Sequence, residues 1–128
     1  MIAINIIFVH RFLTSLFFTD VVETLVLILL LRVLFKNRTE ISRLIFAGLY
    51  ASFSTISYVW FVFPYLTNWP SSVAIGFAEL FAFVTEAVLY RFVLRLDWKV
   101  AFFVSLVCNL VSYVVGPILR TYGLWPSW

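Results

Sequence analysis

Long apolar runs, separated by short polar segments, dominate the pattern of this chain. Four such runs predict helices at about 12–35, 42–63, 72–96 and 98–119. With a rise of about 1.5 Å per residue, each is long enough to cross a hydrocarbon core about 30 Å thick. The pattern therefore predicts an all-α integral membrane protein, in which residues 1–128 form one domain of four transmembrane helices in a compact bundle.

The polar segments set the expected ends of these helices. Residues 36–40 are mostly charged, and Pro64 is expected to end the second helix because proline lacks the N–H that a helix interior needs. Two serines at 71–72 favour the start of the third helix. Residues 1–11 fit a separate interfacial helix as well as the outer end of the first helix, and both alternatives stay open.

The two halves of the chain show a weak internal repeat. In each half a glutamate in the first helix precedes an arginine, and a polar pair in the second helix is followed by a tyrosine. Such halves would form two parallel helix-hairpin repeats, as in some transporters, whereas chance similarity between apolar sequences is the alternative. The matched residues are Glu23 and Glu86, Arg32 and Arg95, Ser54 and Asn109, Ser57 and Ser112, and Tyr58 and Tyr113.

Composition excludes a soluble globular domain. Hydrophobic residues make up 64% of the chain and charged residues 12%, whereas soluble domains average about 45–50% and about 25%. The mean hydropathy is +1.08. So short a chain can bury this much apolar surface only by using lipid as its solvent. The single cysteine, Cys108, lies in an apolar run, so we expect neither an internal disulfide nor a Cys-based metal site.

Basic residues predict the orientation in the membrane. All but two of the nine Lys and Arg residues lie near the first and third connections, which places those connections in the cytoplasm. Both termini are then non-cytoplasmic, and we expect the cytoplasmic membrane of a bacterium or archaeon. An aromatic collar is predicted at the opposite interface. Its members are Trp60, Tyr65, Trp69, Tyr122, Trp125 and Trp128.

Four acidic residues lie inside predicted helices, two in the first and two in the third. Each costs about 2.5–3.5 kcal/mol at the bilayer centre on insertion scales, so such residues normally face the bundle interior and meet a partner. Asp20 and Glu23 share one helix face, and Glu79 and Glu86 share another. Glu23 and Glu86 fall at similar depth near the midplane, where no basic residue is available to pair with them.

Polar side chains on the other helices are the natural partners of these acids. Ser105, Asn109 and Ser112 follow one another at +4 and +3 and form one stripe on the fourth helix. The second helix carries Tyr50, Ser54 and Ser57 at similar spacing, and Gly48 with Ser52 offers a small face for close helix packing. The predicted polar core lies between the first, third and fourth helices. It consists of Glu23, Glu86, Asn109, Ser105 and Ser112, with Asp20 and Glu79 as further members.

Two functional hypotheses follow. The favoured one is a non-enzymatic subunit that packs with other membrane chains, or with copies of itself, in a larger assembly, with the acids acting as hydrogen-bonding groups between helices. The alternative is a small proton- or cation-linked transporter or channel that uses Glu23 and Glu86. An enzyme is not expected, because His10 is the only histidine and no phosphate loop or catalytic motif is present. No cofactor or nucleic-acid partner is predicted.

Overall fold

The computed structural model describes residues 6–66 and 70–123, and 88% of these residues are helical. Over these residues the all-helical prediction is confirmed, with four long helices and no strand. The elements are α1 (Ile6–Leu29) with its π-helical continuation η1 (Leu30–Leu34), α2 (Ile41–Phe61), the short α3 (Phe63–Leu66), α4 (Ser71–Val93) and α5 (Trp98–Thr121).

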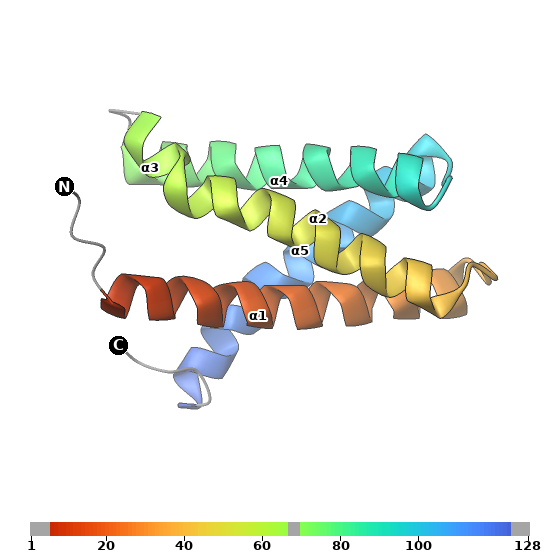
Figure 1. The fold of residues 1–128 in the computed structure, drawn as a ribbon, viewed down its shortest axis with the longest axis horizontal. Coiled ribbons are helices and arrows are strands. Elements are labelled where there is room, and N and C mark those ends of the chain that lie inside the picture. The colour runs from red at the N-terminus through yellow and green to blue at the C-terminus, as the bar shows by residue number, and fades with distance from the viewer. Residues whose placement is uncertain (1–5, 67–69, 124–128) are drawn as a thin grey trace.

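The four long helices form a ring in which neighbours run antiparallel. Both α1 and α4 pack against α2 and α5, so α1 and α4 face each other across the bundle. Figure 1 shows α3, the start of α1 and the end of α5 at one end of the bundle, which we call the termini end. The α1–α2 and α4–α5 connections lie at the opposite end, which we call the hairpin end.

The outer surface of the bundle is apolar. Within the described residues, α2, residues Ser72–Val93 of α4, and α5 are long and apolar enough to cross a membrane. Large apolar side chains are exposed on every long helix, which suggests that lipid or other membrane chains cover them. Examples are Phe17, Leu25, Phe46, Phe53, Ile75, Phe92, Leu110 and Val114.

Several helix ends differ from the predicted ones. Because α1 begins at Ile6, the described residues 6–11 belong to the first helix. The second helix ends at Phe61, and Pro64 lies in the first turn of α3, where a missing N–H costs no helical hydrogen bond. The last helix continues through Pro117 to Thr121. Trp69, Trp125 and Trp128 of the predicted aromatic collar lie outside the described residues.

The two hairpin connections begin with the same backbone conformation. The helix-ending residues Phe35 and Leu94 have φ/ψ of −93°/−5° and −97°/−4°, respectively. The residues that follow, Lys36 and Arg95, are both left-handed, with φ of 49° and 54°. A left-handed residue cannot continue an α-helix. The third helix therefore ends at Val93, not at the predicted residue 96.

Close packing of α1 on α2 depends on Gly48. A Cβ atom added at Gly48 would lie 3.0 Å from both Cα and Cβ of Thr24, which is tighter than ordinary van der Waals contact. Thr24 is itself buried on α1. The small-residue face predicted at Gly48 and Ser52 is therefore the surface that lets these two helices approach.

Replacing Gly48 by alanine should destabilise the bundle, because the new methyl group meets the backbone of α1. We expect the free energy of unfolding to fall by about 1–3 kcal/mol, as for other overpacked sites. Denaturation in mixed detergent micelles measures this. The matched control is Gly76→Ala on α4, where an added Cβ meets nothing within 4 Å. Equal stability of the two variants would contradict the packing argument.

Candidate functional site

Two buried glutamates face each other across the bundle. Glu23 of α1 is 2% exposed and Glu86 of α4 is 1% exposed. The helices that carry them are opposite members of the ring, and the two carboxyl groups are close enough to interact electrostatically. Buried acids of this kind require hydrogen-bond partners.

Each carboxyl group accepts two hydrogen bonds from side chains. Glu23 accepts from Ser52 Oγ at 2.5 Å and from Ser112 Oγ at 2.8 Å. Glu86 accepts from Thr55 Oγ1 at 2.9 Å and from Asn109 Nδ2 at 2.6 Å. In both cases the two donors reach different oxygens of the carboxyl group. All four carboxyl oxygens therefore have a donor, which offsets much of the cost of their burial.

The donors are arranged with approximate twofold symmetry. Each glutamate takes one donor from the second helix of its own hairpin, Ser52 for Glu23 and Asn109 for Glu86. It takes the other from the second helix of the opposite hairpin, Ser112 for Glu23 and Thr55 for Glu86. The polar network thus joins both hairpins.

The hydrogen bonds relate the two hairpins by other residues than those matched in the sequence. Asn109 and Ser112 take the places of Ser52 and Thr55, not those of Ser54 and Ser57. The latter two donate to carbonyl oxygens of their own helix, Ser54 to Tyr50 at 2.7 Å and Ser57 to Phe53 at 2.9 Å.

The two donors on α2 that the prediction missed, Ser52 and Thr55, can be recognised in the sequence by their spacing. Gly48, Ser52 and Thr55 are spaced at +4 and +3, as are Ser105, Asn109 and Ser112 on α5. The stripe through Tyr50 had the same spacing, but Tyr50 is exposed. Periodicity alone does not decide which stripe of α2 faces inward, and the predicted polar core therefore omits α2.

Ser105 belongs to the network only indirectly. Its hydroxyl donates to the Phe83 carbonyl of α4 at 2.7 Å rather than to a carboxyl group. Its own carbonyl accepts a second hydrogen bond from Asn109 Nδ2 at 2.9 Å. Ser105 therefore ties α5 to α4 and orients the Asn109 amide toward Glu86.

Asp20 and Glu79 lie outside the central pair. Asp20 is partly buried on α1, one turn nearer the termini end than Glu23, and its Oδ1 atom has no hydrogen-bond partner among the described residues. Glu79 is exposed on α4. Glu79 lines the cavity that leads to the central pair, whereas Asp20 does not.

A cavity of about 170 Å³ leads to the two glutamates. Its lining comes from the halves of the long helices that lie toward the termini end, and among the described residues no Lys, Arg or His lines it. Its buried lining residues are Glu23, Thr55, Ile56, Ala82 and Glu86, and Asn109 and Ser112 beside them are partly buried. Its outer wall includes Ser15, Thr19, Trp60, Glu79 and Tyr113.

The hairpin half of the bundle is closed. There the core is apolar and contains contributions from all four long helices and the α4–α5 connection. Its members are Leu27, Leu31, Leu44, Ala47, Ala51, Tyr90, Leu94, Leu96, Ala101, Val104 and Cys108. We call this set the apolar cluster. The acids therefore lie where a polar cavity meets a closed apolar half.

Within the parts of the chain that the structure describes, no group of three or more His, Cys, Asp or Glu residues has a geometry suited to a metal ion. No protein-family model, curated protein or solved structure matches this chain. The geometry of the carboxyl pair and its cavity is therefore the basis for assigning a function.

Proposed function

We propose that this chain is a small, non-enzymatic membrane transport protein, in which Glu23 and Glu86 bind and release a proton or another cation. In this proposal α1 is the fourth membrane span. The observation that carries it is the one-sided cavity, which ends on two buried, fully hydrogen-bonded carboxyl groups. If the two carboxyl groups served only to hydrogen-bond the helices together, no cavity would need to reach them.

The lining of the cavity favours positively charged ligands. Three acids, Glu23, Glu79 and Glu86, contribute to it, and no basic side chain does so among the described residues. Walls of one charge sign raise the local concentration of the opposite ion. With the basic residues placed in the cytoplasm, the cavity opens toward the non-cytoplasmic side.

The donors also allow the pair to change its protonation state without breaking the network. A hydroxyl group can donate to a carboxylate or accept from a protonated carboxyl group. Both partners of Glu23 are hydroxyls, so either of its oxygens can carry a proton. On Glu86 the Asn109 amide donates to Oε2, which leaves Oε1, beside the Thr55 hydroxyl, as the oxygen that takes the proton.

The test is ion flux into liposomes that contain the purified chain, measured with a pH-sensitive dye and with Na⁺ and K⁺ indicators. Glu23→Gln and Glu86→Gln should each reduce flux to the level of empty liposomes, since glutamine keeps the shape but cannot release a proton or balance a cation. Glu40→Gln, an exposed acid at the hairpin end, is the control and should keep the parental rate. Absence of flux in the parent chain, or unchanged flux in both carboxyl variants, would reject the proposal.

The second candidate is a subunit of a larger or homo-oligomeric assembly, and one observation favours it. An apolar groove of about 320 Å³ lies on the outside of α3 and α4, where a helix of another chain or a lipid would fit. Native mass spectrometry from mild detergent distinguishes the two candidates. A chain that carries ions alone is a transporter, whereas an inactive chain that retains a membrane partner belongs to an assembly.

A further inference from the structure

The closed half of the bundle raises the question of how an ion could leave the carboxyl pair toward the hairpin end. The apolar cluster that fills this half consists mostly of Leu, Ala and Val side chains. Tyr90 and Cys108 are its two members whose side chains carry a hydrogen on oxygen or sulfur. The buried Ser105 hydroxyl, between Val104 and Cys108 on α5, is already engaged with the Phe83 carbonyl oxygen. Tyr90 and Cys108 are therefore the members of the cluster best suited to form a polar route.

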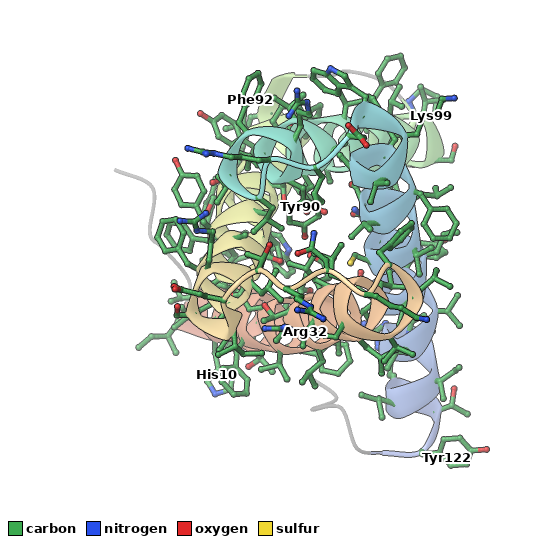
Figure 2. The ribbon with its side chains drawn as sticks, turned by 90° about the vertical axis from the view of Figure 1, so that its right-hand side faces the viewer. His10, Arg32, Tyr90, Phe92, Lys99 and Tyr122 are labelled. Carbon is green, nitrogen blue, oxygen red and sulfur yellow. The ribbon has the colours of Figure 1, made fainter. Side chains whose placement is uncertain are left out.

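Tyr90 is placed directly behind Glu86. It lies four residues further along α4, so its side chain is on the same helix face and one turn nearer the hairpin end. Figure 2, which looks onto the hairpin end, shows Tyr90 in the interior between the helices, whereas Phe92 points outward. The Tyr90 side chain is 0% exposed.

The hydroxyl group of Tyr90 makes no hydrogen bond of full strength among the described residues, and the Cys108 thiol is the side chain placed to pair with it. Buried hydroxyls are nearly always paired, because an unpaired one loses its hydration without compensation. The thiol itself donates to the Glu23 carbonyl oxygen at 3.6 Å, and Glu86 and Glu23 are also neighbours of Tyr90. A hydroxyl that is held so weakly can reorient toward a carboxyl group.

We infer that the ion carried by this protein is the proton, and that the Tyr90 hydroxyl relays it between Glu86 and the hairpin end. The inference rests on the proposed transport function and specifies its substrate. A metal ion needs several oxygen ligands at each step of its path, and the apolar cluster offers one hydroxyl and one thiol. A proton needs only one group that can accept and donate.

The relay conserves protons at each step. In this relay the Tyr90 side chain first moves within hydrogen-bond distance of Glu86. Protonated Glu86 then donates its proton to the Tyr90 oxygen, while the Tyr90 hydroxyl gives its own proton to a water molecule that reaches it when the hairpin half opens. Rotation of the hydroxyl group then restores the starting arrangement.

The experiment compares Tyr90→Phe with the parent chain in liposomes. Phenylalanine keeps the ring and removes only the hydroxyl, so we expect proton flux to fall at least tenfold while the protein stays folded. Tyr58→Phe, an exposed tyrosine on α2, is the matched control and should keep the parental rate. Proton flux through the parent should also slow in D₂O, and if Tyr90 carries the proton the size of this isotope effect should change in Tyr90→Phe.

Ion selectivity of the parent chain provides a readout that needs no variant. Proton flux without Na⁺ or K⁺ flux is expected. Metal-ion flux as fast as proton flux would overturn the inference and leave the transport proposal standing. Parental proton flux in Tyr90→Phe would overturn the relay alone, and no flux of any ion in the parent would reject both proposals.

Discussion

Replacing Thr55 by valine and Asn109 by leucine in one chain is expected to lower the free energy of unfolding by about 1–3 kcal/mol. The two substitutions roughly keep the side-chain volume but remove both donors to Glu86. A buried carboxyl group without donors bears the full cost of its lost hydration. Hydrogen bonds inside membrane bundles are worth roughly 0.6–2 kcal/mol each, which sets the size of the effect.

A double-mutant cycle shows whether this loss acts through Glu86. In a Glu86→Leu background no acid remains to be satisfied, so the same two substitutions should cost less than about 0.5 kcal/mol. Denaturation in mixed micelles gives all four stabilities. Equal losses in both backgrounds would mean that Thr55 and Asn109 stabilise the bundle by packing alone.

Ser54→Ala with Ser57→Ala is the matched control for this cycle. These serines lie on α2 close to Thr55, but they donate to carbonyl oxygens of their own helix. Their removal should change stability by no more than about 0.5 kcal/mol. The comparison distinguishes the face of α2 that donates hydrogen bonds to the acids, which carries Thr55, from the face with Ser54 and Ser57 that the helical spacing also indicated.

Replacing Ala82 by phenylalanine is expected to reduce transport at least tenfold by filling the cavity. Ala82 is buried on α4 and lines the cavity between its mouth and the carboxyl pair. Because the added ring occupies empty space, we expect stability to change by less than about 1 kcal/mol, in contrast to insertion into a packed core. Liposome flux and micelle denaturation measure the two quantities on one preparation.

Leu80→Phe controls for the extra ring on the same helix. Leu80 is 54% exposed on the outer surface of α4, so its substitution should leave transport unchanged. Parental flux in Ala82→Phe would show that ions do not reach Glu23 and Glu86 through this cavity. Equal loss in both variants would point to a general disturbance of α4.

The two ends of the bundle core differ in polarity and packing, which is why some of these predictions concern transport and others concern stability. Toward the termini end, polar side chains and a cavity surround the acids, so changes there alter access. Toward the hairpin end, the apolar cluster is closely packed, and Tyr90 is the one hydroxyl within it. The hydrogen-bonded glutamates lie at the boundary and connect the two hairpins. A movement of one hairpin relative to the other would therefore act directly on the donors of both acids.

The sequence by itself determined the helical class, the approximate helix positions and the identity of the central acids. Apolar runs of sufficient length form helices whatever their neighbours, and an acid near the middle of such a run is expected to turn inward, whereas Glu79, nearer the end of its helix, is exposed. Glu23 and Glu86 could therefore be named before any contact was known. Asn109 and Ser112 could be named in the same way, because few other polar residues on α5 share one helix face.

Only the tertiary structure decided which face of α2 meets the acids and where the bundle is hollow. Two polar stripes on α2 have the same helical spacing, and the choice between them depends on how α2 rotates against α1, where Gly48 packs on Thr24. The cavity and the weakly held Tyr90 hydroxyl arise from the way four helices fit together. Periodicity fixes which residues share a face, but the packing of neighbouring helices fixes where that face points.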